Sequence, residues 1–311
     1  MNAFVFPGQG CQKIGMGKDL FDKFPISREF FSKANATLGW DITDVMFNGT
    51  ENELMETKNT QPAIFVYEVA LAKSQDSILP DIVAGHSLGE FAALVISGVL
   101  DFEEALRIVY YRAIYGQKAC EKTPTAMAAV IGLSDEYVDK RIKEIWNETG
   151  EPVYFANFNG PGQVVISGSK EGIKIACKAF KNEGAKKAVR LAIGGSFHTP
   201  FMAEAQQELK EIILKANFRN ASIPVVQCVD AKIHIDAYEI RRNLIDHITS
   251  PVQWTSMVNR IVENGVSHVY EVGTDDTLQK IVKRMVPSLN VDSILNIDKY
   301  KGIIHNYSII N

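Results

Sequence analysis

The 311-residue chain has few of the features that would place it in several large classes of protein. It contains only four cysteines, Cys11, Cys120, Cys177 and Cys228, and no two of them have the C-x-x-C spacing of metal sites and redox motifs. Scattered thiols are typical of a reducing compartment, so we expect free cysteines and no bound metal. The formal net charge of −4 argues against a nucleic-acid-binding protein, whose surface would be basic.

Long apolar segments are also missing: no run of apolar residues approaches the ~20 residues that a membrane-spanning helix needs. The first residues, MNAFVFPGQG, have no basic segment and reach proline and glycine after a short apolar stretch. This pattern predicts a strand over 2–6 and not a signal peptide. The composition, with 46% hydrophobic and 23% charged residues, is ordinary for a globular protein. We therefore expect a cytoplasmic protein that does not bind a membrane.

Strand-like and helix-like segments alternate along most of the chain, which predicts a parallel sheet covered by helices. A buried strand over 81–84 precedes a helix over 88–97. Pro62 is expected at the first turn of a helix, where its missing N–H does no harm. Asp101 and Glu104 have the spacing of a capping box at the start of another helix.

The segment 125–192 has a different order, strand–helix–strand–strand–helix–strand, which predicts a ferredoxin-like unit. Helix and strand patterns resume after it, so the unit should be an insert. The predicted fold class is therefore α/β with two domains. Residues 1–124 and 193–311 would form a large α/β-hydrolase-like domain with a parallel sheet, and residues 125–192 a small ferredoxin-like domain.

The pentapeptide Gly85–Gly89, GHSLG, fits the pattern G-x-S-x-G. It follows an apolar strand and precedes a helical pattern, which is the context of a nucleophile elbow. In such an elbow Ser87 would expose its hydroxyl on a sharp turn, and the helix N-terminus behind it would offer N–H groups to an oxyanion. An ordinary strand-to-helix turn has the same pattern, so Ser87 is at this point a candidate nucleophile.

A serine nucleophile needs a general base, and histidine is the first candidate. The six histidines are His86, His198, His234, His247, His268 and His305. His86 adjoins Ser87, so its side chain should leave the turn in another direction and support the site from behind. His268 stands in an apolar strand, as core histidines do, and the three in polar segments are typical of solvated surface residues. His198 lies in a glycine-rich loop between a strand and a helix, which makes it the best candidate base.

Several motifs in order along nearly the whole chain resemble those of malonyl-CoA:acyl-carrier-protein transacylases, including the free-standing acyltransferases of polyketide synthases. The motifs are FPGQG at 6–10, QPAIFVYEVAL at 61–71, GHSLGEFAAL at 85–94, Arg112, AMAAVIGL at 126–133, ANFNGPGQVVISG at 156–168, SFHTPFM at 196–202, SPVQWTSMV at 250–258 and YEVGTDDTL at 270–278.

The resemblance implies a role for each matching residue. Ser87 would attack the thioester of an acyl-CoA, and His198 would accept its proton. A main-chain carbonyl at the position matching Gln253 would hold the histidine in place of an aspartate. The N–H groups of Leu88 and Gln9 would form the oxyanion hole.

The resemblance also implies how the acyl group is selected. Arg112 would bind the free carboxylate of a malonyl group bidentately, although an arginine on a helix is more often solvated or ion-paired. Phe197 resembles the malonyl-selecting form of its loop. Gly195–Ser196 departs from the commonest family pattern, which leaves methylmalonyl or another extender open. Ile114–Gln117 departs where family members often have a methionine near the glutamine, which would reshape the pocket wall and leaves the acyl chain length open. Asn159 matches a position close to the pocket, and a turn-forming role is an equal alternative.

The partners implied are malonyl-CoA and an acyl carrier protein or carrier domain. CoA would leave and the phosphopantetheine thiol would enter the same cleft, with CoA as a substrate, no permanent cofactor and a monomeric enzyme. Basic side chains could steer an acidic carrier protein; the candidates are Lys181, Lys186, Lys187, Arg190, Lys280, Lys283 and Arg284. Two other functions stay open, an acyl hydrolase that clears stalled acyl groups from carrier proteins and a non-catalytic docking module. Arg112 favours transfer of a dicarboxylic acyl group over hydrolysis.

Overall fold

The structure is a computed structural model that describes residues 1–191 and 195–298. The strands are β1 (Asn2–Phe6), β2 (Ile82–Gly85), β3 (Thr125–Ile131), β4 (Val153–Gly160), β5 (Gln163–Ser169), β6 (Lys187–Arg190), β7 (Val225–Val226), β8 (Ile233–His234), β9 (His268–Glu271) and β10 (Asn290–Ser293). The α-helices are α1 (Lys18–Lys23), α2 (Pro25–Leu38), α3 (Ile42–Asn48), α4 (Glu51–Met55), α5 (Thr57–Lys73), α6 (Gly89–Ile96), α7 (Phe102–Lys122), α8 (Asp135–Thr149), α9 (Lys170–Asn182), α10 (Ala203–Lys215), α11 (Ala237–Asp246), α12 (Trp254–Glu263) and α13 (Thr277–Met285).

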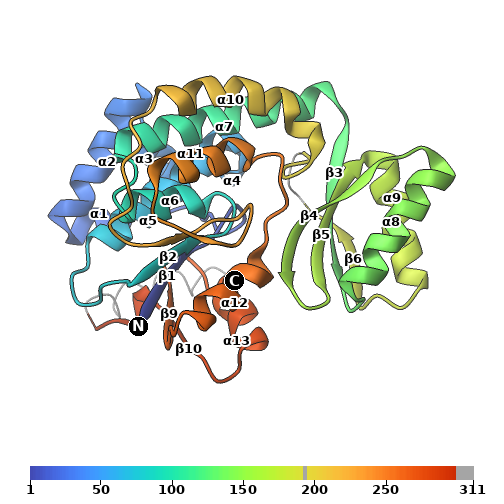
Figure 1. Cartoon of the computed structure of the whole chain (residues 1–311). Coiled ribbons are helices and arrows are strands. Elements are labelled where there is room, and N and C mark those ends of the chain that lie inside the picture. The colour runs from blue at the N-terminus through green and yellow to red at the C-terminus, as the bar shows by residue number, and fades with distance from the viewer. Residues whose placement is uncertain (192–194, 299–311) are drawn as a thin grey trace.

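The larger of the two sheets has the strand order β10-β9-β1-β2-β7-β8. All its neighbouring strands are parallel except β8, which is antiparallel to β7. The central strands β1 and β2 are almost completely buried, as a parallel sheet with helices on both faces requires. Helices α5, α6 and α7 share a hydrophobic core with one face, and α12 and α13 pack on the other (Figure 1). The predicted parallel sheet covered by helices is confirmed.

Helix α5 begins at Thr57, so the prediction that Pro62 stands at a helix start was wrong. A proline at this depth removes one backbone hydrogen bond from the helix. The helix forms nevertheless because it is buried on all sides, from Thr57 to Ala72 with the exception of one lysine. Tertiary packing supplies most of the stability of a buried helix and outweighs the missing bond.

The capping box predicted at the start of α7 is also absent, because both acidic side chains have other partners. Asp101 precedes the helix but makes no side-chain cap, and its carboxylate pairs with Arg219 at 2.6 Å. A Glu104 carboxylate oxygen accepts the backbone N–H of Asn217 at 2.9 Å. The acidic pair therefore holds the segment after α10 against α7.

The smaller sheet is antiparallel throughout, with the order β4-β5-β3-β6. Helices α8 and α9 cover one of its faces and share a core with it, so this unit stands to one side of the larger one (Figure 1). The order of its elements is the one predicted. Backbone bonds join β4 to the larger unit, since Phe158 N–H donates to the Val252 carbonyl and Val252 N–H donates to the Ala156 carbonyl, each at 2.9 Å. These bonds fix the end of β4 above the larger sheet.

Two expectations from composition can be checked in the described residues. All four cysteines carry free thiols. No helix within 1–191 and 195–298 combines the length and the apolar character needed to cross a bilayer.

Candidate active site

Ser87 stands on a sharp turn between β2 and α6, and its φ of 53° is in the left-handed region that non-glycine residues rarely adopt. The flanking glycines make the turn possible. A Cβ on Gly85 would lie 2.0 Å from the carbonyl carbon of Gly89, and one on Gly89 would lie 2.1 Å from the carbonyl oxygen of Phe6. Only glycine fits at both positions, so the G-x-S-x-G pattern here is the strand–turn–helix predicted from the sequence.

His198 meets Ser87 directly, with its Nε2 2.6 Å from the serine Oγ. Its own φ is 65°, so both residues hold unusual backbone conformations. The other ring nitrogen, Nδ1, lies 3.1 Å from the carbonyl oxygens of both His247 and Ser250. Carbonyl oxygens only accept hydrogen bonds, so Nδ1 carries the hydrogen and Nε2 presents its lone pair to the serine hydroxyl. This is the tautomer that a general base needs.

The position predicted for the supporting carbonyl, Gln253, was wrong. Gln253 is the residue before α12, and its backbone N–H donates to the Cys228 carbonyl at 3.0 Å. The carbonyls that hold His198 come from the preceding turn, where the N–H groups of Thr249 and Ser250 bond back to the Asp246 carbonyl. That turn brings two carbonyls to one nitrogen, which the sequence motif alone does not reveal.

His247 was expected on the surface and is instead only 1% exposed. Its ring packs edge-on against that of His198, with 5.4 Å between the centroids. His234 is also buried, where it pairs with Asp230 at 2.9 Å, and His268 is half-buried in β9. The sixth histidine, His305, lies outside the described residues.

The pKa of His198 is lowered from 6.5 to about 3, chiefly by burial and in addition by the nearby positive charge of Arg112. The two carbonyl hydrogen bonds act against this shift without cancelling it. His198 is therefore neutral at physiological pH and free to accept a proton.

Arg112 projects from α7 into the same site and is 2% exposed. Its guanidinium donates to Gln61 Oε1 at 2.7 Å and to Ser87 Oγ at 3.1 Å, and its Nε has no hydrogen-bond partner. Both of these hydrogen-bond partners, an amide oxygen and a hydroxyl, are uncharged. Burial lowers the pKa of Arg112 to about 10, which leaves it charged at neutral pH. The site thus holds a buried cation beside the serine whose direct hydrogen-bond partners are neutral, while the charge of Glu90 acts on it from a longer distance.

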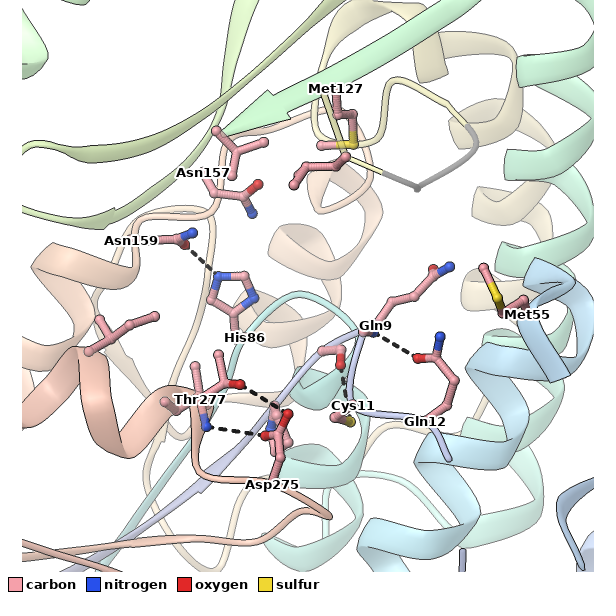
Figure 2. Close-up of a pocket in the computed structure, with 17 residues that line it drawn as sticks. Gln9, Cys11, Gln12, Met55, His86, Met127, Asn157, Asn159, Asp275 and Thr277 are labelled. Atoms are coloured by element: carbon pink, nitrogen blue, oxygen red, sulfur yellow. Dashed lines mark hydrogen bonds between the residues drawn. The ribbon is translucent and has the colours of Figure 1, made fainter. Parts of the chain in front are cut away.

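A small cavity of about 70 Å³ lies in front of these groups; it is lined by Gln9, Gln61, His86, Ser87, Leu88, Arg112, Met127, Asn157, Phe197 and His198. It shares Gln9, His86, Met127 and Asn157 with an adjoining cavity of about 500 Å³. Figure 2 shows this larger cavity between the loop that carries Gln9 and Cys11 and the strands that carry Met127 and Asn157. Ser87 therefore stands at the end of a cleft between the two units.

His86 lines both cavities, and its Nε2 lies 2.8 Å from Asn159 Oδ1 (Figure 2). Asn157, two residues earlier, lines both cavities and was not singled out from the sequence. Gln61 was also missed, although it begins the motif QPAIFVYEVAL and holds the guanidinium of Arg112. Asn157 and Gln61 lie within the motifs ANFNGPGQVVISG and QPAIFVYEVAL, which could have marked them.

A buried cluster behind the site comprises Glu90, Cys228 and His247, whose potential metal-ligating atoms lie within 4.8 Å of one another. The carboxylate of Glu90 accepts the Cys228 N–H at 2.7 Å and the Gln227 side-chain N–H at 3.0 Å. The Cys228 thiol donates to the Gly85 carbonyl at 3.0 Å. These bonds connect α6, the helix after Ser87, to the segment 227–228. Glu90 and Cys228 therefore have a structural role.

The model of the acyl transferase domain family matches residues 3–301 of the chain. The chain belongs to the acyl transferase domain family. Among curated members, the malonyl CoA-acyl carrier protein transacylase of Salmonella typhimurium is 40% identical over 295 residues, 94% of this chain and 95% of that one. The enzyme of the same name from Bacillus subtilis is 36% identical over 285 residues, 91% of this chain and 90% of that one.

Solved structures of acyl transferases agree with the fold. An acyl-carrier-protein S-malonyltransferase from Burkholderia pseudomallei superposes with a TM-score of 0.91 at 35% identity, covering 98% of this chain and 99% of that one. A malonyl-transacylase solved in complex with its type II polyketide synthase acyl-carrier protein also gives 0.91, at 38% identity with 98% and 99% coverage. The mixed α/β fold, with a parallel sheet and a second, antiparallel sheet, is thus shared with malonyltransferases.

Proposed function

We propose that this acyl transferase moves a malonyl group from malonyl-CoA to the phosphopantetheine thiol of an acyl carrier protein, through an acyl-enzyme on Ser87. The observation that carries the proposal is Arg112, a buried guanidinium 3.1 Å from the nucleophile whose direct hydrogen-bond partners are neutral. A buried charge needs a counter-ion, and the free carboxylate of a dicarboxylic acyl group supplies one in the fork geometry that arginine prefers. Relatives named malonyl CoA-acyl carrier protein transacylase support the same substrate.

In the first half-reaction Ser87 Oγ attacks the thioester carbonyl carbon while its proton passes to Nε2 of His198. The 2.6 Å separation and the neutral state of the histidine support this transfer. The carbonyls of His247 and Ser250 then stabilise the imidazolium through Nδ1–H. When the carbon–sulfur bond breaks, the proton moves from His198 to the departing CoA sulfur, and the malonyl ester of Ser87 remains.

The second half-reaction reverses these steps with another thiol. The phosphopantetheine thiol gives its proton to His198 and its sulfur attacks the ester carbonyl carbon. The Ser87 oxygen leaves and takes the proton back, so the enzyme returns to its starting state. The cleft of about 500 Å³ offers one path for both thiols, which fits the ping-pong order.

For the oxyanion we propose the backbone N–H groups of Leu88 and Gln9. Both residues line the small cavity with Ser87, and Leu88 directly precedes α6, whose N-terminus favours negative charge. Loss of one such donor typically costs about 10²–10³ in kcat. Phe197 is proposed as a wall of the acyl pocket, and His86 with Asn159 as the pair that supports the cleft side of the turn.

The carrier protein is proposed to dock on basic side chains near the cleft. Of the seven candidates, Lys280 pairs with Asp276 and Lys283 donates to the Leu289 carbonyl. Lys186 and Arg284 instead line one open hollow of about 380 Å³. They are the two candidates that line a common hollow, and Lys181, Lys187 and Arg190 are exposed elsewhere on the small unit.

The finer organisation of the chain is also part of the proposal. We propose an α/β-hydrolase-like domain over 1–124 and 193–311 and a ferredoxin-like domain over 125–192, which the antiparallel order β4-β5-β3-β6 supports. The second boundary falls at 192–194, outside the described residues. We further propose a monomer, a cytoplasmic location, where CoA thioesters are available, and no permanent cofactor or metal.

Intact-protein mass spectrometry tests the function. After mixing with malonyl-CoA, the protein should gain one malonyl group, lose it on addition of carrier protein, and gain none in Ser87→Ala. Discharge of the acyl group to water and not to the carrier would make the chain a hydrolase, and the absence of any adduct would make it a docking module.

A further inference from the structure

Gly116 lies on α7 one turn after Arg112, and a ring packs directly against it. A Cβ at Gly116 would lie 2.6 Å from Cζ and 2.7 Å from Cε1 of Phe197, closer than real Cβ contacts come. A glycine inside a helix is destabilising relative to alanine. The glycine is needed here because the missing side chain lets the Cζ–Cε1 edge of the ring pack directly against the helix.

The other side of the ring faces the site. Phe197 lines the cavity of about 70 Å³ together with Ser87, and its ring centroid is 5.1 Å from Cζ of Arg112. The position of the ring therefore fixes the wall of the acyl pocket next to the proposed carboxylate clamp.

The ring has little freedom to move away from the site. Phe197 is 5% exposed and belongs to a packed cluster with Ala119, Met202 and Ile248. Protein interiors are close-packed, so a displaced ring moves into whatever empty space adjoins it. That space is the cavity. A side chain at Gly116 would push the ring away from α7 into this cavity and narrow the pocket.

We propose that Gly116 is a specificity-determining residue: by seating Phe197 against α7 it leaves room for a substituent on the α-carbon of the acyl group. The inference rests on the proposed function, because it takes the acyl group to be held between Ser87 and Arg112. It identifies the substrate class as malonyl-type groups that include α-substituted members such as methylmalonyl.

The test is a competition. Wild-type protein is acylated in a single turnover with equal amounts of malonyl-CoA and methylmalonyl-CoA, and both adducts are counted by mass spectrometry. The wild type should form both adducts. In Gly116→Ala the ratio of methylmalonyl to malonyl adduct should fall at least ~10-fold, the size of discrimination that one methyl group supports in a pocket. Arg107→Ala, an exposed change on the same helix, should leave the ratio unchanged.

A double variant tests whether the ring mediates the effect. In Gly116→Ala/Phe197→Leu the shorter side chain no longer fills the space, so the methylmalonyl adduct should return. An unchanged ratio in the single variant, with normal malonyl acylation, would overturn the inference, as would a double variant that keeps the low ratio. Failure of the wild type to take malonyl at all would instead overturn the proposed function.

Discussion

The hydroxyl oxygen of Ser87 lies 2.6 Å from Nε2 of His198, although 111 positions separate the two residues in the sequence. Both residues have a left-handed backbone conformation, with a φ of 53° at Ser87 and 65° at His198. Such conformations cost free energy and persist only where the surroundings enforce them. Ser87 and His198 are thus held in place by two separate turns, one from β2 to α6 and one before the helical turn at 200–202.

Substitution of the base should reduce acylation while leaving the fold intact. In His198→Gln the serine keeps a polar neighbour but loses the group that accepts its proton. General-base catalysis typically contributes about 10²–10⁴-fold, so the rate of malonyl-adduct formation should fall by that factor. Stopped-time mass spectrometry gives the rate, and near-ultraviolet circular dichroism controls for folding. If the rate of malonyl-adduct formation in His198→Gln stayed within threefold of wild type, His198 would not be the general base.

Substitution of Arg112 should separate substrates by their charge. Truncation of one partner of a buried charge pair costs about 2–5 kcal/mol, so Arg112→Ala should lower kcat/KM for malonyl-CoA at least ~30-fold. Acylation by acetyl-CoA, which has no carboxylate to bind, should fall much less or rise. Arg112→Lys is the matched control, because it keeps the charge but loses the planar fork, and it should recover only part of the activity. Equal losses for both donors would contradict the carboxylate role.

The elements close to the nucleophile could be predicted because they follow from local patterns. An apolar strand, two glycines around a serine and a helical pattern leave few backbone solutions, and the steric contacts of Gly85 and Gly89 explain why. The glycine-rich loop likewise marked His198. The family resemblance added Arg112, which no local pattern distinguishes from a solvated arginine.

Relationships between distant segments could not be predicted in the same way. The carbonyls that hold His198 belong to residues 49 and 52 positions further along the chain. They lie in the turn before Gln253, where the sequence had predicted the supporting carbonyl. His247 stands in a polar segment and is buried because α6 and the loop of His198 close over it. Pro62 is in a helix interior because burial outweighs the local cost of proline. In each case tertiary packing determined the structure, and the local sequence pattern had predicted another one.

Acidification should destabilise the protein in a way that depends on His198. Its pKa is about 3 when folded and 6.5 when exposed, so between these values the unfolded chain binds a proton that the folded protein does not. Stability therefore rises with pH in this window and is lost as the pH falls from about 6.5. One such group contributes up to ~1.4 kcal/mol per pH unit. Urea denaturation between pH 7 and 5 should show a shallower loss in His198→Gln than in wild type, and parallel curves would contradict the assignment.

Carrier docking should depend on charge at Lys186 and Arg284, which line one hollow beside the turn at 161–163. Reversal of both charges should raise KM for an acidic carrier protein about tenfold or more at low salt and much less at 0.5 M salt, because ions screen surface charges. The serine is first loaded from a malonyl thioester that lacks phosphates, so that any effect on CoA binding is excluded. Lys140→Glu, a strongly exposed change on α8, is the control and should leave KM unchanged. If malonyl transfer to the carrier protein at low salt were as fast in the double variant as in the wild type, the carrier protein would not dock at Lys186 and Arg284.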